Sequence, residues 1–206
     1  MTISLQGETV VITGGGVRVG RAIALACARA GANVAITYNR SGEQATATLR
    51  ELRECGCEEA QFSAYQCEVS DGAQVAELAA KVQRDFGQVT ALVNNAAIFR
   101  RTPFETMNEG DFDDHINSNL KGPYLLSKAF GDIFVAQERG SIVNIADIHG
   151  LKPLKNYVPY CVSKAGIIML TQALAKALAP HVRVNCICPG TILLPSEHQG
   201  DGEYGD

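Results

Sequence analysis

The sequence predicts a single α/β domain built on a doubly wound parallel sheet, and three observations support this prediction. Short apolar runs alternate with helical patterns along nearly the whole chain, which is typical of a parallel sheet covered by helices. The first of these runs leads directly into a glycine-rich turn and then into a helix of small residues. With 206 residues, 46% of them hydrophobic, the chain is long enough for one domain with a substantial core.

Apolar runs and breaker residues delimit the individual elements. Strands are expected over residues 9–13, 33–38, 60–67, 90–93, 141–146 and 181–187. Helices are expected over residues 21–29, 43–55, 71–86, 108–137 and 159–179. Gly31 is expected to end the first helix in a left-handed conformation, and Asn108 is expected to cap the long fourth helix.

Composition and charge argue against two classes of partner. The 18 basic and 22 acidic residues sum to −4 with no block of Lys or Arg, so no nucleic-acid partner is expected. No apolar run reaches the roughly 18 residues that a membrane span needs. The first ten residues do not resemble a signal sequence. We therefore expect a cytoplasmic protein with no membrane partner.

The seven cysteines show neither the spacing of a zinc site nor that of a secreted disulfide framework. They form two C-x-C pairs and three isolated positions: Cys55 with Cys57, Cys186 with Cys188, and Cys27, Cys67 and Cys161. We interpret them as small core residues and predict no metal site.

The turn Gly14-Gly15-Gly16 lies between the first strand and the first helix. Backbone N–H groups at the start of a helix, together with the helix dipole, favour an anion, and glycines let the backbone approach it closely. A glycine cluster also occurs as a plain turn. Here the strand before it and the helix after it favour a dinucleotide pyrophosphate site.

The residues after the second strand bear on cofactor selectivity. In NAD-binding proteins an acidic residue about twenty positions past the glycines holds the adenosine ribose. This chain has Tyr38, Asn39, Arg40 and Ser41 there. An arginine and a serine suit a 2′-phosphate, so we predict NADPH; the alternative is a solvated surface arginine.

Tyr160 and Lys164 lie four residues apart on a predicted helix, which places a phenol and an ammonium on the same helical face. A fixed cation beside a phenol favours the phenolate, so the pair is expected to donate and accept protons. Asp147, thirteen residues upstream at the end of a strand, could reach the same substrate atom. The alternative is that the spacing is a coincidence.

Two further segments are expected near a cofactor. The loop from Asn94 to Phe99 follows the fourth strand, at the sheet edge where such folds bind ligands, and Phe99 offers an aromatic face for stacking. Phe99 could equally be an ordinary core residue. Pro123 lacks an N–H, so the carbonyl of Asn119 loses its helical partner and could hold a water, unless the proline only kinks the helix.

The helix that carries Tyr160 is apolar on nearly all sides. Between Tyr157 and Ala179 its only charged residues are Lys164 and Lys176. A chain of this size can hardly cover such a helix alone. We therefore predict a homo-oligomer, a tetramer, that packs partly on this helix.

Together these residues resemble the short-chain dehydrogenase/reductase family over nearly the whole chain. The matching motifs are Thr13-Gly14-x-x-x-x-x-Gly20, Asn94-Asn95-Ala96, Asn119, Tyr160-x-x-x-Lys164 and Pro189-Gly190. The resemblance implies a Rossmann-like fold in which Tyr160 donates the proton. Lys164 would bind the nicotinamide ribose and lower the tyrosine pKa, and Asn119 would hold a relay water through its main chain.

The resemblance also implies a set of cofactor contacts around the ends of the strands. These are Thr13, Gly14, Arg18, Val19, Gly20, Tyr38, Asn39, Arg40, Ser41, Glu68, Val69, Asn95, Ala96, Ala97, Tyr160, Lys164, Pro189 and Gly190.

Two departures from the family pattern resemble its pteridine reductase branch. Arg18 stands where most members have glycine, and Asp147 stands where most have serine. Phe99 is similar to the branch's pterin-stacking phenylalanine, and Arg40-Ser41 to its NADPH-binding pair. The resemblance implies that Arg18 also contacts the substrate, with Phe99, and that Asp147 and Tyr160 deliver the proton.

The predicted function is NADPH-dependent reduction of a dihydropterin or dihydrofolate. An ionised carboxylate a few ångströms from a ketone oxygen that gains negative charge would repel it by about 1 kcal/mol or more. A C=N bond instead needs a proton on nitrogen, which a carboxylic acid can relay. The alternatives are carbonyl reduction, of a 3-oxoacyl thioester or a small ketone, and an NADPH-binding protein without turnover.

The end of the chain departs from the family pattern. Family members usually continue for roughly forty residues, through substrate-covering helices and a last strand. Here Leu193-Leu194-Pro195 leads into the polar tail GDGEYGD. We therefore expect one domain over 1–206 that lacks the usual last strand, with an atypical or truncated part at about 195–206. The roles of Arg100 and Arg101 beside the substrate are left open.

Overall fold

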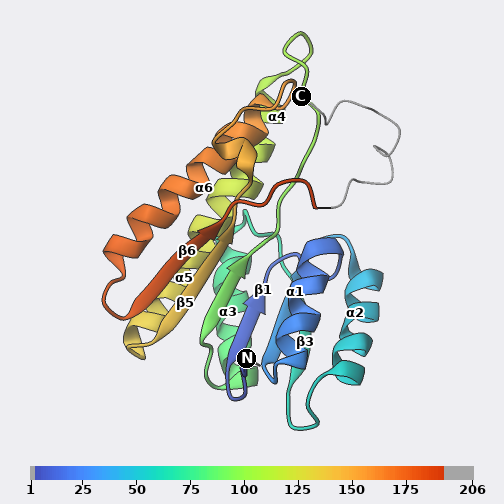
Figure 1. Cartoon of the computed structure of the whole chain (residues 1–206), viewed down its shortest axis with the longest axis vertical. Coiled ribbons are helices and arrows are strands. Elements are labelled where there is room, and N and C mark those ends of the chain that lie inside the picture. The colour runs from blue at the N-terminus through green and yellow to red at the C-terminus, as the bar shows by residue number, and fades with distance from the viewer. Residues whose placement is uncertain (1–2, 193–206) are drawn as a thin grey trace.

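The computed structural model describes residues 3–192 and shows a six-stranded parallel sheet flanked by helices (Figure 1). The strand order is β3-β2-β1-β4-β5-β6, and every neighbouring pair is parallel. The strands are β1 (Thr9–Ile12), β2 (Asn33–Tyr38), β3 (Phe62–Gln66), β4 (Ala91–Asn94), β5 (Gly140–Ile145) and β6 (Val182–Ile187). The predicted fold class is confirmed.

The helices divide between the two faces of the sheet. They are α1 (Arg18–Arg29), α2 (Gly42–Cys55), α3 (Gly72–Phe86), α4 (Glu109–Ile116), α5 (Gly122–Ala136) and α6 (Val158–Ala177). Val10 and Ile12 of β1 pack with residues of α1 and α2, whereas Val11 packs with residues of α3, α5 and α6. Successive residues of a strand face opposite ways, so β1 to β5 each contribute to both clusters, whereas β6 contributes Val182 and Val184 to the cluster with α3 and α5.

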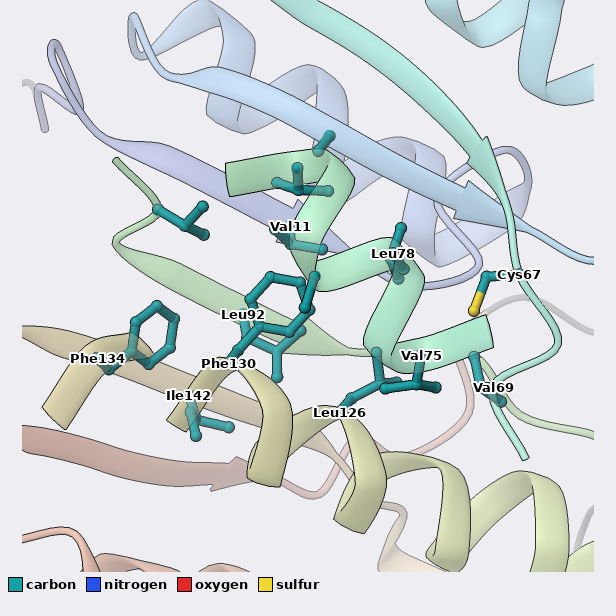
Figure 2. Packing of buried hydrophobic residues seen from close by; sticks show 14 of the residues in the cluster. Val11, Cys67, Val69, Val75, Leu78, Leu92, Leu126, Phe130, Phe134 and Ile142 are labelled. Carbon is teal, nitrogen blue, oxygen red and sulfur yellow. The ribbon is translucent and has the colours of Figure 1, made fainter. Parts of the chain in front are cut away.

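The larger core cluster lies between the sheet and helices α3 and α5 (Figure 2). Phe130 and Phe134 of α5 are fully buried with Leu92 of β4 and Ile142 of β5. Burying a side chain of this size contributes roughly 1.5–3 kcal/mol. The packing fixes β4 and β5, whose carboxyl ends carry the candidate site.

The long helix expected over residues 108–137 is interrupted, which corrects that prediction. α4 ends at Ile116, a π-helical turn occupies Asn117–Lys121, and α5 begins at Gly122. The Gly122 N–H reaches the Asn117 carbonyl five residues back. Pro123 has no N–H to continue the ordinary ladder, so the widened turn is its structural consequence.

The predicted helix ends at Asn108 and Gly31 are confirmed. The Asn108 side chain accepts a hydrogen bond from the Asp111 N–H, and the Asp111 carboxylate accepts one from the Asn108 N–H, forming a capping box. Gly31 follows α1 with φ +92°, a conformation that glycine adopts without strain.

The prediction that all cysteines fill the core is wrong for Cys57. Cys67 and Cys161 are buried, but Cys57 is exposed after the end of α2. The other four are half-buried. Among residues 3–192, no group of three or more His, Cys, Asp or Glu side chains is placed to hold a metal ion.

Helix α6 is long and apolar enough to cross a membrane by length and composition alone. Core helices of soluble proteins meet the same criterion. Here the buried residues of α6 include Tyr160 and Lys164, and the helix packs against β6. The absence of a membrane partner stays a prediction.

Strand β6 forms one edge of the sheet in the described part of the chain (Figure 1). Ile187 at its carboxyl end is 52% exposed. The segment expected to be atypical, about 195–206, lies outside the described residues.

Candidate active site

A cavity of about 940 Å³ opens at the carboxyl ends of the strands. Most of the predicted site residues line it: Gly14, Arg18, Val19, Gly20, Tyr38, Asn39, Arg40, Ser41, Glu68, Asn95, Ala96, Ala97, Phe99, Asp147, Tyr160, Lys164, Pro189 and Gly190. Val69 lines a smaller neighbouring cavity of about 140 Å³. The fold therefore brings segments that are far apart in the sequence to one place.

The glycine turn is shaped to bring backbone close to a ligand. Gly14 has φ +62°, and a Cβ on Gly20 would overlap the Gly14 carbonyl and the Asn95 side chain. No side chain caps α1 at Val17, and the first turn of the helix contains no acidic residue. Uncapped N–H groups beside a cavity fit the pyrophosphate of a dinucleotide.

Arg18 adopts a backbone conformation that side-chain-bearing residues rarely take. Its φ is +47°, at a position that lines the cavity. A non-glycine residue held in the left-handed region costs roughly 1–2 kcal/mol, and such outliers cluster at ligand sites. The strain is therefore an observation in favour of a role for Arg18 at the cavity.

Thr13 supports the site from beneath, because its side chain is buried and does not line the cavity. Its hydroxyl accepts hydrogen bonds from the backbone N–H groups of Asn95 and Ala96, both at 3.0 Å. The Asn95 side chain in turn donates to the Thr13 carbonyl at 2.8 Å. This network joins the end of β1 to the loop after β4.

Residues after β2 form the other end of the cavity. Arg40 is exposed and Ser41 half-buried, and both line the wall. The Asn39 amide donates to the Glu68 carboxylate, and the Gln66 side chain donates to the Asn39 carbonyl at 3.0 Å. These contacts fix the chain at Asn39, next to Arg40 and Ser41.

The predicted proton-transfer residues converge in the structure. The Tyr160 hydroxyl donates to Oδ2 of Asp147 at 2.7 Å, and Oδ1 of Asp147 accepts from the His149 N–H at 2.8 Å. Lys164 Nζ lies 5.6 Å from the centre of the Tyr160 ring and donates to the Ile145 carbonyl at 2.8 Å. The carboxylate, the phenol and the amine therefore form one cluster on the cavity wall.

Lys164 is only 4% exposed. Burial lowers its pKa from 10.5 to about 8, and the nearby charge of Asp147 opposes that shift, as do the thiols of Cys186 and Cys188. A desolvated ammonium interacts strongly with nearby groups because little water screens it. Lys164 can therefore stabilise negative charge that develops on the Tyr160 oxygen.

Asn119 is 1% exposed and lies behind the cavity wall. Its amide accepts from the Ile98 N–H at 2.8 Å and donates to the Ile98 carbonyl at 3.0 Å and to the Ser163 hydroxyl at 3.1 Å. The side chain thus joins the π-helical turn, the loop after β4 and α6. Its place in that turn agrees with the predicted role for its main chain, which stays a prediction.

Phe99 is half-buried and part of an aromatic cluster. Its ring stacks on Tyr157 with centroids 4.5 Å apart and an interplanar angle of 9°, and it meets Tyr160 edge-on at 4.7 Å. Phe99 also lines the cavity. The expectation of a stacking surface must therefore allow for Tyr157, which covers one face of the ring.

Several cavity residues were not among the predicted ones. They include Ile98, Arg100, Asp114, Asn117, Ser118, His149, Thr191 and Ile192. Arg100 and Asp114 form an exposed ion pair at 2.5 Å. Arg101 is exposed beside it. Asp114, Asn117 and Ser118 are spaced i, i+3 and i+4, so a helix places them on one face. The spacing alone does not say whether that face meets a cavity.

The fold and the site define an oxidoreductase of the nicotinamide-binding kind, and comparison with known proteins agrees. A family model described as short chain dehydrogenase matches residues 8–201. The chain belongs to the short-chain dehydrogenase/reductase family.

Named relatives differ in their substrates. The chain is 35% identical to a 3-oxoacyl-acyl-carrier-protein reductase FabG of Staphylococcus epidermidis, over 91% of this chain and 76% of the relative. It is 33% identical to a D-threitol dehydrogenase of Mycolicibacterium smegmatis, over 98% of this chain and 77% of the relative. Among solved structures, an NAD⁺-bound xylitol dehydrogenase superposes with a TM-score of 0.85 at 32% identity, covering 90% of this chain and 70% of that one.

Proposed function

We propose that this protein reduces a C=N bond of a pteridine, of the dihydropterin or dihydrofolate type, with NADPH as the reductant. The observation that carries the proposal is the 2.7 Å hydrogen bond from the Tyr160 hydroxyl to the Asp147 carboxylate. It supports a proton path that includes the Asp147 carboxyl group. In a site that only reduces ketones, this group would face the oxygen on which negative charge develops.

The proposed chemistry assigns a separate task to each residue of the cluster. A bound reduced nicotinamide would supply the hydride. Tyr160 would donate the proton toward the substrate nitrogen, and Asp147 would relay a replacement proton to it. Lys164 would hold the cofactor ribose and stabilise charge on the phenol oxygen.

Electrostatics supports a nitrogen substrate over a ketone. Two unit negative charges 4 Å apart repel by about 1 kcal/mol in water and by about 4 kcal/mol at the effective dielectric near a protein surface. A ketone oxygen gains such a charge as hydride arrives, whereas an imine nitrogen gains a proton and needs a donor. An ionised Asp147 would therefore raise the barrier for C=O reduction. In C=N reduction the carboxyl group would take up a proton from water and pass it on through Tyr160.

Residues at both ends of the cavity also support a pterin substrate and NADPH. Arg18 lies in its strained conformation at the cavity, and Phe99 presents an aromatic ring beside Tyr160. A planar, electron-poor ring is bound well by an aromatic side chain and a guanidinium. At the other end, Arg40 and Ser41 offer a cation and a hydroxyl, which suit a 2′-phosphate and favour NADPH over NADH.

Carbonyl reduction is the second candidate, and the names of the relatives favour it. A 3-oxoacyl thioester reductase and a polyol dehydrogenase both stand among proteins at 33–35% identity. In this case Asp147 would have to accept a proton or turn away from the substrate oxygen.

A side-by-side assay of NADPH oxidation separates the two candidates. We expect turnover of dihydrobiopterin or dihydrofolate, slower turnover of an acetoacetyl thioester, and weaker use of NADH than of NADPH. Faster reduction of the thioester would reject the pteridine assignment, and equal or better use of NADH would reject the cofactor assignment. A Tyr160→Phe variant with unchanged activity would reject catalysis through this cluster and favour a binding protein without turnover.

A further inference from the structure

His149 lies two residues after Asp147, in the short 3₁₀ turn Ile148–Gly150 that follows β5. Its backbone N–H donates to Oδ1 of Asp147 at 2.8 Å, while the Tyr160 hydroxyl donates to Oδ2 of the same carboxylate at 2.7 Å. His149 also lines the cavity. The Asp147 carboxylate therefore lies between the phenol and the residue that carries the imidazole.

The Lys152 carbonyl determines where the neutral His149 ring carries its proton. Nδ1 of His149 lies 3.0 Å from this carbonyl oxygen. A carbonyl oxygen only accepts hydrogen bonds, so Nδ1 is the donor and Nε2 holds the lone pair. Among residues 3–192, no group forms a hydrogen bond with Nε2. The ring can therefore gain and lose a proton at Nε2 while Nδ1 stays bound and the ring does not rotate.

The proton-transfer cluster has to regain a proton after each turnover. Reduction through this cluster removes the hydroxyl proton of Tyr160, whether the substrate holds a C=N or a C=O bond. Tyr160 is 5% exposed and Asp147 is half-buried, so the pair has little direct contact with solvent. Imidazole accepts and releases protons near neutral pH. Among residues 3–192, His149 is the only histidine that lines the cavity.

From this arrangement we propose that His149 is the residue through which Asp147 and Tyr160 regain their proton from solvent. Nε2 takes a proton from water in the cavity and releases it through water to the Asp147 carboxylate. Asp147 then protonates the Tyr160 oxygen, which has given its own proton to the substrate. In each turnover one proton enters from solvent and one leaves in the product, and no electrons move along this path.

The inference rests on the proton donation by Tyr160 in the proposed function, but not on the identity of the substrate. A C=O substrate would take the same proton from Tyr160. The two proposals can therefore fail separately.

Two other histidines show what distinguishes His149. His115 of α4 is fully buried, with Nδ1 2.7 Å from the Asp111 carbonyl, and its ring meets Tyr160 edge-on at 6.5 Å. Full burial separates His115 from water. His181 is half-buried like His149, but it precedes the amino end of β6, whereas the cavity lies at the carboxyl ends of the strands. His181 is therefore the matched control.

The test compares the full-length wild type with H149A and H181A. NADPH oxidation is measured with dihydrobiopterin and with an acetoacetyl thioester, and the substrate that the wild type reduces faster is used for all variants. We expect kcat of H149A to fall by about a hundredfold, with KM and NADPH affinity within about twofold of wild type. H181A should keep the kcat of the wild type. Fluorescence titration measures NADPH affinity without any substrate.

Rescue by free imidazole separates proton transfer from structural support. Added imidazole should raise kcat of H149A by about tenfold or more, because it replaces the missing proton-exchanging ring. H149N keeps an N–H that can donate to the Lys152 carbonyl but has no nitrogen that exchanges protons near neutral pH. We expect H149N to be as slow as H149A, with unchanged NADPH affinity, and this variant carries the test if H149A does not fold.

Two results would overturn the proposal. One is a kcat of H149A and H149N within about twofold of wild type. The other is a loss of kcat that imidazole does not restore and that is accompanied by weaker NADPH binding, which would assign His149 a structural role. A wild type that reduces only the thioester would reject the pteridine assignment, whereas imidazole rescue of H149A with that substrate would still support the role of His149.

Discussion

Among single residues, Lys164 combines the deepest burial of a charge with a place in the catalytic cluster. Its pKa falls from 10.5 to about 8 because the folded protein desolvates the ammonium. Between these values the unfolded chain binds the proton more tightly than the folded one, so stability rises with pH across this window. At neutral pH the buried ammonium therefore destabilises the cofactor-free protein by about 3 kcal/mol relative to the neutral amine.

A Lys164→Met variant tests whether the buried ammonium destabilises the protein. Removing the buried charge should raise the free energy of unfolding at pH 7 by about 1–3 kcal/mol, and the difference should shrink between pH 8 and 10. Denaturant unfolding at pH 7 and pH 10 measures it, with the exposed Lys176→Met on the same helix as the matched control. A variant that is less stable than wild type at pH 7 would contradict the assignment of burial as the main cause.

Individual site residues differ in how far the sequence could predict them. The four-residue spacing of Tyr160 and Lys164 was enough to predict that both side chains lie on one helical face, because helix geometry depends only on local sequence. The bond from Tyr160 to Asp147 depends on where a strand and a helix meet, and the sequence could predict only that the carboxylate was within reach. Thr13 and Asn119 were expected to contact ligand or water, but a motif does not say whether a side chain faces the cavity or supports it.

At the scale of elements, buried amides connect two strands and two helices behind the site. The Asn94 side chain donates to Asn144 Oδ1 at 2.8 Å, across the register that pairs these two residues in β4 and β5. Asn144 in turn donates to the Thr171 hydroxyl of α6 at 2.8 Å, and Asn94 also donates to the Ser127 hydroxyl of α5 at 3.1 Å. Asn144 and its partners are all buried.

We expect Asn144→Ala to destabilise the protein by about 2–4 kcal/mol, because it leaves a cavity and removes partners from the buried groups of Asn94 and Thr171. Urea unfolding would measure the change. Asn185→Ala, at an exposed position of the neighbouring strand β6, should stay within about 0.5 kcal/mol of wild type. If Asn144→Ala also lowered the free energy of unfolding by no more than about 0.5 kcal/mol, the hydrogen-bond network would not be what holds β4, β5, α5 and α6 together.

The order and type of the elements were predictable because apolar periodicity reports which face of each segment is covered. For the helix expected over 108–137, the sequence predicted a disturbance at Pro123 but not that the helix is divided by a π-helical turn. The Gly122-Pro123 pair indicated that the regular helical hydrogen bonds are interrupted. That the interruption takes the form of a π-helical turn depends on the packing of Asn119 against Ile98 and Ser163. The sheet register likewise depends on contacts between distant segments, which a local pattern does not contain.

At the scale of the whole molecule, large apolar side chains are exposed on the helices that follow the site loop. Phe112 of α4, Tyr124 of α5, and Val162 and Met169 of α6 are 41–62% exposed. Neighbouring exposed apolar residues mark surfaces for association. This observation favours the predicted homo-oligomer, in which α6 would pack against a second copy of the chain; that the oligomer is a tetramer stays a prediction.

Light scattering after size exclusion tests the oligomer at micromolar concentration. We expect the mass of a multiple of the chain, and a shift toward the monomer in the double variant Val162→Glu/Met169→Lys, because charges placed in an apolar interface oppose burial. Phe104→Ser is the control, since Phe104 is 77% exposed outside these helices. A monomeric wild type would reject the proposal.

We propose that Asp147 acts with Tyr160 to direct the site toward C=N reduction. Its most direct test is the ratio of kcat/KM for dihydrobiopterin to kcat/KM for an acetoacetyl thioester, measured with NADPH in wild type and in Asp147→Ser. We expect a ratio that favours the pterin in wild type and falls by about a hundredfold or more in the variant, about 2.7 kcal/mol of transition-state discrimination. The same ratio in both proteins, or a wild type that prefers the thioester, would contradict it.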